Sequence, residues 1–446
     1  TPAVKNLSGK LHIISLGCPK NLIDSEVMGG LACQAGMILV DRPEDADTII
    51  INTCSFIRSA TEESLDVILT LGETKRKTGS AQKLVVAGCL AQRYGSDLAR
   101  EIPEADLIIG TGEVANIVSH LKADRRGTVI TKPDFLMSSV HERLLPRGAF
   151  TAYLKISEGC SNRCAYCIIP SLRGKARSRR PEDICREAES MAKRGIREII
   201  LVGQDTAAYG RDLKTRPGLP ELLSGLASIS KLRWIRLMYT HPAHLGKTTL
   251  EAMASHKKIC RYIDLPVQHI DDTILTAMKR GISADRTKNI ISLVRGIMPD
   301  AALRTSLIVG FPGETKKRFA RLLDFVRETR FDHLGVFTYS REEGTAAAAM
   351  PSRIAQREKE RRREIIMSEQ ATISYELNRK LLGSVQEVLI ETMSEGEDYP
   401  FIGRCRRQAP EIDGVTYVRG GGAVPGRFVR CRITAADHYD LYAEII

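Results

Sequence analysis

Residues 158–167 have the sequence EGCSNRCAYC, which places Cys160, Cys164 and Cys167 at the spacing C-x3-C-x2-C. The segment follows an apolar run, Phe150 to Ile156, that is typical of a β-strand. Cysteine thiolates are the usual ligands of iron–sulfur clusters, and three of them can hold three irons of a [4Fe–4S] cluster. The fourth iron then has no ligand from this loop and stays open to a small molecule.

A zinc site is the alternative interpretation of this loop. Structural zinc sites are normally four-coordinate and closed, and no fourth ligand is evident near the three cysteines in the sequence. Tyr166, directly before the last cysteine, favours the cluster, and with it the loop resembles that of the radical S-adenosylmethionine (SAM) enzymes. The resemblance implies that the open iron binds the amino acid end of SAM, which is cleaved to methionine and a 5′-deoxyadenosyl radical.

Length and composition favour a cytoplasmic enzyme of several domains. The chain has 446 residues, of which 43% are hydrophobic and 27% charged, and its length suggests about three domains. We expect no membrane span, because no apolar run reaches about 18 residues, and the first residues lack the apolar core of a signal peptide. Eleven cysteines in such a chain indicate metal ligands and buried thiols more than disulfides. The net charge of +12 weakly favours an anionic partner such as the ribosome or RNA.

Three more cysteines, Cys18, Cys54 and Cys89, each follow an apolar strand. The strands alternate with helical patterns, which predicts a doubly wound parallel sheet. In such sheets ligands bind at the carboxyl ends of the strands, so residues about 35 apart can converge there, and we expect a second cluster with three protein ligands. A single cysteine of this kind is more often a buried structural thiol. The expected strands and helices are Leu11–Leu16, Thr48–Ile51 and Lys83–Ala87, with Asn21–Gln34 and Ser59–Lys77.

The other five cysteines show no such pattern, and we interpret them as structural. They are Cys33, Cys185, Cys260, Cys405 and Cys431.

Six strand-like runs between Phe150 and Ser340 alternate with helical stretches, which suits a partial TIM-like barrel with its active site at the carboxyl ends of the strands. The cysteine loop follows the first of these strands. The strands are Tyr153–Ile156, Glu198–Val202, Trp234–Met238, Tyr262–Leu265, Leu303–Val309 and His333–Tyr339, and the helices include Pro181–Arg194 and Lys316–Thr329.

With both cysteine triads, the chain is similar to the radical SAM methylthiotransferases from about Leu11 to its end. Members add an –SCH3 group at an unactivated C–H bond. One branch, MiaB-like, modifies an adenosine of tRNA, and the other, RimO-like, modifies the β-carbon of an aspartate in ribosomal protein S-twelve. Three motifs resemble the second branch: Ser15–Glu26 (SLGCPKNLIDSE), Gly203–Gly210 (GQDTAAYG) and Ala409–Gly414 (APEIDG). Gln408 stands before the last motif, where relatives commonly carry Asp.

The resemblance implies two [4Fe–4S] clusters, one on each triad, and two uses of SAM. One SAM supplies the methyl group and another the radical, and the upstream cluster carries the sulfur. It also implies SAM contacts from Tyr166, Gly203, Gln204, Asp205, Gly310 and Glu314. Beyond the clusters we assign no catalytic residue, because His269, at the end of the fourth strand, is more often structural than an acid or base. Expected partners are protein S-twelve, free or on the ribosome, and an electron donor, with no membrane.

From about Leu382 the pattern changes to short alternating strands with Gly-rich turns, which predicts a five-stranded antiparallel barrel like the TRAM domain of this family. This segment has ten acids and seven arginines, a net charge of −3. An acidic barrel suits a basic ribosomal protein better than tRNA. The expected domains are an N-terminal methylthiotransferase domain at 9–125, a radical SAM domain at 146–378 and TRAM at 382–446.

Two alternatives remain open. The tRNA-modifying activity is one, and an iron–sulfur RNA-binding or assembly factor without catalysis is the other. The basic run Arg353–Arg363 is interpreted as a solvated linker helix in preference to a ribosome contact.

Overall fold

A six-stranded parallel sheet forms the N-terminal region, in the order β2-β1-β3-β4-β5-β6. The computed structural model describes residues 7–78, 82–351 and 353–446. Strand β3 is buried along its whole length, as expected where helices cover both faces of a parallel sheet. The predicted doubly wound domain is confirmed. Its elements are β1 (Lys10–Ser15), α1 (Pro19–Gln34), β2 (Ile38–Leu39), β3 (Thr48–Thr53), α2 (Arg58–Thr78), β4 (Lys83–Gly88), α3 (Cys89–Glu101), β5 (Leu107–Ile109), α4 (Ile117–Lys122) and β6 (Gly127–Val129).

Six parallel strands form the central region as two three-stranded sheets, β7-β10-β11 and β12-β13-β14. A single bridge between Ile235 and Ile259 links their neighbouring edges, so the strands make a partial barrel, as predicted. The strands are β7 (Thr151–Lys155), β10 (Glu198–Val202), β11 (Trp234–Leu237), β12 (Tyr262–Asp264), β13 (Ala302–Val309) and β14 (His333–Thr338). The helices are α5 (Ile169–Arg173), α6 (Pro181–Lys193), α7 (Leu219–Ser228), α8 (Lys247–Ser255), α9 (Asp272–Ala277), α10 (Ala284–Ile297), α11 (Lys316–Thr329) and α12 (Gln356–Arg379), with β8 (Ser157–Glu158) and β9 (Arg177–Ser178) beside the first strand.

A closed five-stranded barrel, in the order β15-β16-β17-β19-β18, ends the chain. The expectation of a fully antiparallel barrel is wrong at one pairing, because β17 and β19 run parallel. A closed ring with an odd number of strands cannot alternate direction at every pairing, so at least one parallel pair is unavoidable. The strands are β15 (Val385–Met393), β16 (Phe401–Cys405), β17 (Thr416–Arg419), β18 (Phe428–Ala436) and β19 (Leu441–Ile445).

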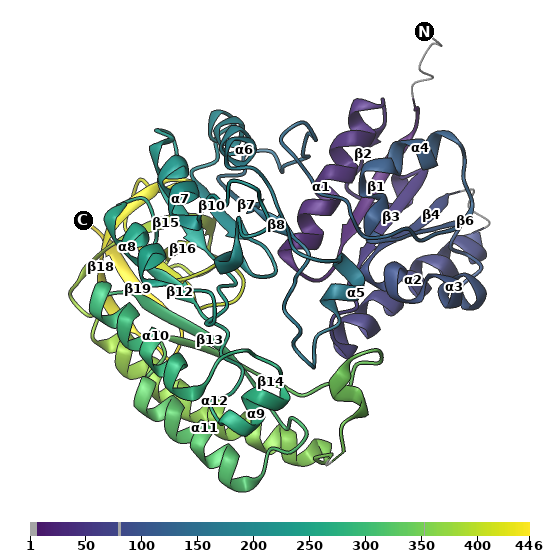
Figure 1. The fold of residues 1–446 in the computed structure, drawn as a ribbon. Helices are drawn as coiled ribbons and strands as arrows, with labels where there is room; N and C mark the ends of the chain where they lie inside the picture. Colours follow the sequence, from purple (N-terminus) through teal and green to yellow (C-terminus); the bar gives the residue numbers. More distant parts are fainter. Residues whose placement is uncertain (1–6, 79–81, 352) are drawn as a thin grey trace.

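The N-terminal domain and the C-terminal barrel lie on opposite sides of the central barrel (Figure 1). The C-terminal barrel packs at the amino ends of the central strands. Arg404 forms a buried ion pair of 2.7 Å with Glu198, the first residue of β10. Asp413, in the APEIDG motif, accepts a hydrogen bond of 2.6 Å from Tyr262, the first residue of β12. The cysteine loop lies at the opposite end of the central barrel, at the carboxyl ends of its strands.

None of the helices in the described part of the chain is both long enough and apolar enough to cross a membrane.

Candidate iron–sulfur and SAM site

The upstream triad lies at the carboxyl ends of three neighbouring strands. Cys18 is the N-cap of α1 after β1, Cys54 directly follows β3, and Cys89 is the first residue of α3 after β4. These strands are adjacent in the order β1-β3-β4. The structure therefore brings together the three cysteines that the sequence pattern singled out.

Two glycines allow the strand ends to approach so closely. Gly17 has φ +85°, and a Cβ there would lie 2.7 Å from the Cys54 sulfur. Gly88 has φ +97°, and a Cβ there would lie 2.3 Å from the Asn52 side-chain oxygen. Both positions combine a left-handed backbone with a close contact, so only glycine fits without a shift.

Asn21 fastens the loops of the upstream triad to one another. Its buried side chain donates hydrogen bonds to the carbonyl oxygens of Leu16 (3.0 Å) and Thr53 (2.7 Å). Its Oδ1 accepts a hydrogen bond from Arg173 and lies 3.8 Å from the Cys89 sulfur. The asparagine of the GCPKN motif therefore has a structural role in shaping this site.

The three upstream thiols influence one another. Burial acts to raise the pKa of Cys18, but the nearby cations Lys20 and Arg173 outweigh it and the pKa is lowered. Burial raises the pKa of Cys54 to about 12, and the thiols of Cys89 and Cys18 add to this rise. The cations favour thiolate at Cys18, the form that binds metals.

The second triad lies in the loop after β8, held to its surroundings by backbone hydrogen bonds. Gly159 has φ +77°, and a Cβ there would lie 2.3 Å from the carbonyl oxygen of Lys175. The Cys160 N–H donates to the Gly174 carbonyl at 3.0 Å. The Ala165 N–H donates to the Met278 carbonyl at 2.9 Å. The loop is therefore fixed at both ends by the barrel.

Arg280 lies against this loop with its guanidinium buried. It donates to the Cys164 sulfur at 3.5 Å, to the Tyr166 hydroxyl at 3.2 Å and to the Pro266 carbonyl at 2.5 Å. Burial raises the pKa of Cys160 to about 11 and that of Cys167 to about 12. The buried positive charge of Arg280 beside these thiols favours their thiolate form, which is the form that binds metals.

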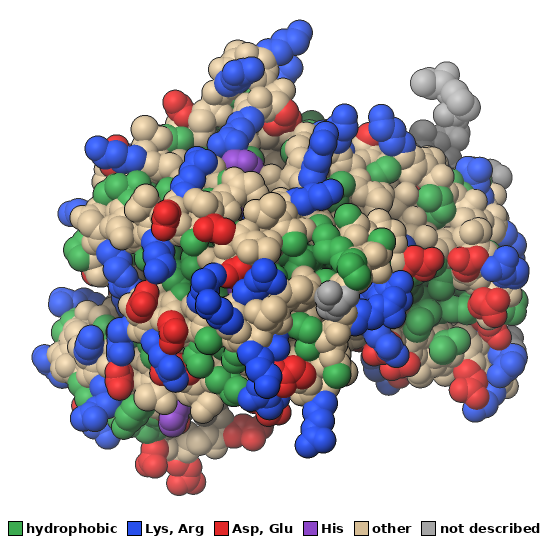
Figure 2. Space-filling model, turned by 60° about the horizontal axis from the view of Figure 1, so that its bottom comes forward, with side chains coloured by type: hydrophobic (Ala, Val, Ile, Leu, Met, Phe, Trp, Pro, Cys, Tyr) green, Lys and Arg blue, Asp and Glu red, His purple; other side chains and the backbone are tan. Residues whose placement is uncertain are grey.

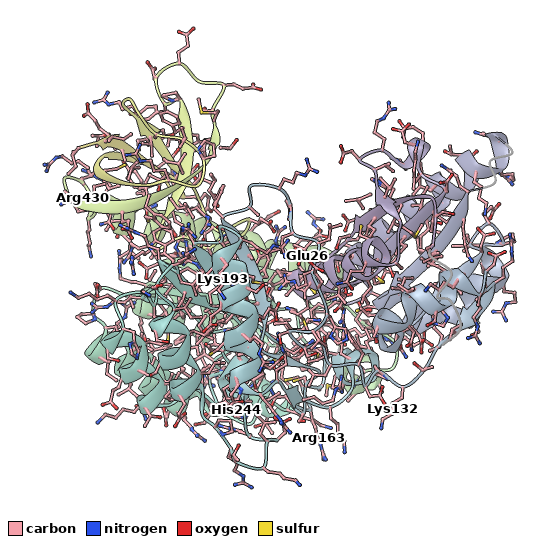
Figure 3. The ribbon with its side chains drawn as sticks, turned by 90° about the horizontal axis from the view of Figure 1, so that it is seen from above. Glu26, Lys132, Arg163, Lys193, His244 and Arg430 are labelled. Carbon is pink, nitrogen blue, oxygen red and sulfur yellow. The ribbon has the colours of Figure 1, made fainter. Side chains whose placement is uncertain are left out.

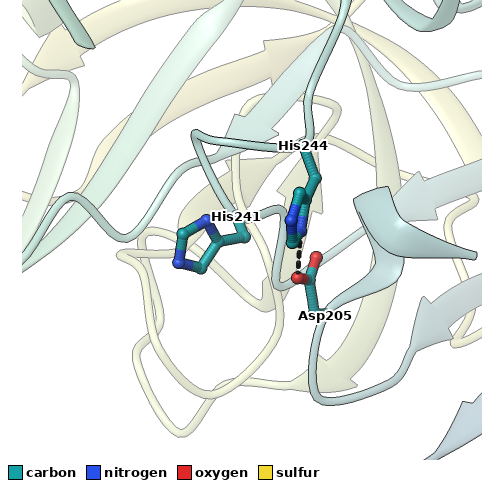
Figure 4. Close-up of side chains that lie close together, drawn as sticks. All are labelled: Asp205, His241 and His244. Atoms are coloured by element: carbon teal, nitrogen blue, oxygen red, sulfur yellow. Dashed lines mark hydrogen bonds and ion pairs between the residues drawn. The ribbon is translucent and has the colours of Figure 1, made fainter. Parts of the chain in front are cut away.

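Asp205, in the loop after β10, lies next to the cysteine loop. It accepts hydrogen bonds from Asn162 at 2.7 Å and from His244 at 2.6 Å (Figure 4). Burial acts to raise the pKa of Asp205, but the hydrogen bond and charge of His244 outweigh it and lower that pKa. Its neighbour Gln204 donates to Glu158 at 2.7 Å. The predicted SAM segment is thus tied to the cysteine loop.

His241 completes this group, and sequence reasoning missed both His241 and His244. The His241 Nδ1 accepts a hydrogen bond of 3.1 Å from the Ala243 N–H, so in neutral His241 the proton lies on Nε2. This Nε2 and the Asp205 Oδ1 are buried without hydrogen-bond partners among the described residues. Both histidines follow the end of β11, so the expectation of an active site at the carboxyl ends of the barrel strands could have found them.

The loop after β13 holds Gly310 and Glu314, which contact each other and residues of α12. The buried Glu314 carboxylate accepts hydrogen bonds from the Gly310 N–H and, at 2.9 Å, from Arg362. A Cβ on Gly310 would lie 2.3 Å from the Lys359 side chain. The close approach that glycine permits here is therefore to Lys359, and the Glu314 carboxylate shapes the loop.

The same contacts correct the interpretation of the basic run. Arg362 is buried and Lys359 packs on Gly310, so α12 is not simply a solvated linker.

His269 is fully buried. Its Nδ1 accepts a hydrogen bond of 3.0 Å from the Asp271 N–H, and its Nε2 lies 3.4 Å from the Glu314 Oε1. These contacts favour the structural role over an acid or base.

A short helix, α5, connects the two triads. It begins two residues after Cys167, and its residue Leu172 packs with Ile168 and Cys89 in one buried cluster. The two triads therefore occupy neighbouring sites at the junction of two domains.

The C-terminal barrel lies away from this junction. Arg163 of the cysteine loop and His244 lie on one side of the molecule, while Arg430 of the C-terminal barrel lies on the opposite side (Figure 3).

Four buried charges reinforce this junction. Asp24 on α1 pairs with Lys155 and Arg173, each at 2.5 Å. Glu158, two residues before Cys160, pairs with the same cations at 2.7 and 3.3 Å. The set is neutral overall, which is the condition for burying charges at acceptable cost. It couples the helix after Cys18 to the strand before Cys160.

The donor sets fit open iron–sulfur clusters better than zinc. A structural zinc ion is normally held by four ligands in a closed site, whereas each triad offers three cysteines. A [4Fe–4S] cluster held by the three thiols of one triad would keep one iron open.

Comparison with known families divides the chain into three matches. Residues 10–110 match an uncharacterised protein family, UPF0004, residues 154–326 match the radical SAM superfamily, and residues 382–446 match the TRAM domain.

Relatives match nearly the whole chain. "Ribosomal protein uS12 methylthiotransferase RimO" of Syntrophus aciditrophicus is 57% identical, with 98% of each chain covered. The protein of that name from Geobacter sulfurreducens is 46% identical, covering 99% of this chain and all of the relative. Among solved structures, the radical SAM methyltransferase TsrM of Kitasatospora setae has a TM-score of 0.56 at 13% identity, covering 85% of this chain and 77% of its own. This likeness concerns the fold.

Proposed function

Because the chain belongs to the RimO family of ribosomal protein uS12 methylthiotransferases, we propose that it adds a methylthio group to the β-carbon of an aspartate in uS12. The observation that carries the proposal is 57% identity over 98% of both chains. Two cysteine triads on either side of α5 support it, because the reaction needs two SAM-dependent steps at neighbouring sites. We place the enzyme in the cytoplasm, with an electron donor as a further partner.

The cofactors of the enzyme are two [4Fe–4S] clusters and SAM, which when bound supply the electron, the radical, the methyl group and the sulfur. We assign one cluster to Cys160, Cys164 and Cys167. The upstream cluster is assigned to Cys18, Cys54 and Cys89, and the SAM surroundings to Tyr166, Gly203, Gln204, Asp205, Gly310 and Glu314. The assigned domains span 9–125, 146–378 and 382–446.

The unpaired groups beside the cysteine loop suit the amino acid end of SAM. Among the described residues, the Asp205 Oδ1 is a buried acceptor without a partner and the His241 Nε2–H a buried donor without one. An α-ammonium would donate to the first and an α-carboxylate would accept from the second. These two residues would therefore orient the amino acid end of SAM.

The charge distribution supports a protein substrate. The C-terminal barrel carries a net charge of −3, so the rest of the chain carries +15. Figure 2 shows Lys and Arg side chains spread widely over one face of the molecule. A basic body suits the RNA surface of a ribosome, and an acidic barrel suits a basic ribosomal protein.

Anaerobic reconstitution with iron, sulfide, SAM and a reductant tests the proposal. The enzyme is offered purified uS12 or tRNA, and both are analysed by mass spectrometry. We expect one methylthio group on a single aspartate of uS12 and none on tRNA. A modified adenosine with unmodified uS12 would contradict the proposal and favour the tRNA activity.

A further inference from the structure

Lys20 lies between the two parts of the site. It is the second residue after Cys18, in the first turn of α1, and is half-buried. Its ammonium lies 3.5 Å from the centroid of the Tyr239 ring. Tyr239 follows β11, in the loop that also carries His241, and its carbonyl accepts a hydrogen bond of 3.1 Å from the Thr206 N–H. Lys20 thus bridges the upstream triad and the loop beside Asp205.

The charge of Lys20 faces the Cys18 thiol and the Tyr239 ring but no carboxylate in the part of the chain that the structure describes. Among the described residues, no carboxylate lies within 4.0 Å of its ammonium, whereas Lys155 nearby pairs with Asp24 at 2.5 Å and Glu158 at 2.7 Å. A cation–π contact attracts the ammonium to the ring but brings no negative charge to it. A half-buried cation of this kind is suited to an anionic ligand.

The ring beneath Lys20 is held in place. Tyr239 has φ +60°, a conformation that is uncommon for a bulky residue and needs support from its surroundings. Asp264 provides it, since its Oδ2 accepts from the Tyr239 N–H at 2.7 Å and its carbonyl accepts from the Thr240 N–H at 3.0 Å. The ammonium is therefore seated on a fixed surface before any ligand arrives.

We propose that the Lys20 ammonium binds the side-chain carboxylate of the substrate aspartate. The inference rests on the proposed function, in which the β-carbon must enter between the two triads. A carboxylate that leaves water for such a site requires a cation, and a charge-assisted hydrogen bond fixes its position. The carboxylate and the β-carbon share one bond, so holding the first positions the second.

Binding of two peptides tests this role. One spans the target aspartate of uS12 and the other has asparagine at that position, and fluorescence anisotropy measures their affinity for the anaerobically reconstituted enzyme. A hydrogen bond to a charged group contributes about 1.5–3 kcal/mol, so we expect wild type to prefer the aspartate peptide by about 10- to 100-fold. Lys20→Met should bind both peptides alike, and Lys20→Arg should keep part of the preference.

Lys193→Met, at an exposed lysine near the end of α6, is the matched control and should keep the full preference. Iron content verifies that each variant is loaded. An undiminished preference in Lys20→Met would overturn the inference while leaving the proposed function intact. A wild-type enzyme that modifies no aspartate of uS12 would overturn both.

Discussion

The two cysteine triads achieve the same donor set by different routes. Cys160, Cys164 and Cys167 come from one loop, whose ends are fastened to the barrel by backbone hydrogen bonds. Cys18, Cys54 and Cys89 come from three strand ends and meet only because the sheet orders those strands side by side. The loop site is encoded locally, whereas the upstream site depends on the packing of a whole domain. We therefore expect the upstream site to be the more sensitive to changes outside its ligands.

The largest effect is expected at Gly17. Gly17→Ala would place a methyl group 2.7 Å from the Cys54 sulfur at φ +85°, so the upstream triad could not close. We predict loss of the upstream iron and of methylthio transfer, with SAM cleavage retained, as measured by iron content and 5′-deoxyadenosine formation. Gly127→Ala is the control, because its φ is +86° with nothing within 4 Å. It should cost only about 1–2 kcal/mol of stability, and equal iron loss in both variants would contradict the steric account.

The next effect concerns the charges between the two sites. Asp24→Asn removes one of two anions and leaves Lys155 and Arg173 with Glu158 alone. Breaking a buried ion pair in this way costs about 3–5 kcal/mol, which chemical denaturation of the loaded enzyme should detect. Glu62→Gln, in the exposed pair with Arg58, should cost less than about 1 kcal/mol. Comparable losses in the two variants would show that the buried set does not hold the sites together.

The smallest effect concerns the loop site alone. Arg280→Gln removes the positive charge beside Cys164 and Tyr166. Charge and hydrogen bonds to the sulfurs set the potential of a cluster, so we predict a lower reduction potential for this cluster. A loss of about 1.5–3 kcal/mol corresponds to about 60–130 mV for one electron. Redox titration followed by EPR measures it, with the upstream cluster as internal reference, and an unchanged potential would rule out this role.

Much of the site was predictable because it lies at strand ends. Apolar runs located the strands, and the rule that ligands bind at carboxyl ends then selected Cys18, Cys54 and Cys89. The cysteine loop was recognisable from its spacing together with Tyr166 and the strand before it. The first two domain folds followed from the alternation of strands and helices. The C-terminal barrel followed from short strands with Gly-rich turns, apart from its one parallel pairing.

Other features depend on contacts between distant segments, which a sequence pattern does not encode. Arg173 reaches Asn21 and Asp24 across the domain junction, and Arg362 reaches Glu314 from 48 residues away. Each is an arginine in a sequence rich in arginine, so composition gives no reason to single it out. The parallel pair of β17 and β19 follows from ring closure, which short alternating patterns do not reveal.

Iron and SAM cleavage in two triple variants test the account most directly. Wild type reconstituted anaerobically should hold about eight irons as two [4Fe–4S] clusters. Alanine at Cys160, Cys164 and Cys167 should leave about four irons and abolish 5′-deoxyadenosine. Alanine at Cys18, Cys54 and Cys89 should also leave about four irons but keep 5′-deoxyadenosine formation while methylthio transfer is lost. Full iron in this second variant would contradict the account, because the upstream triad would then hold no cluster.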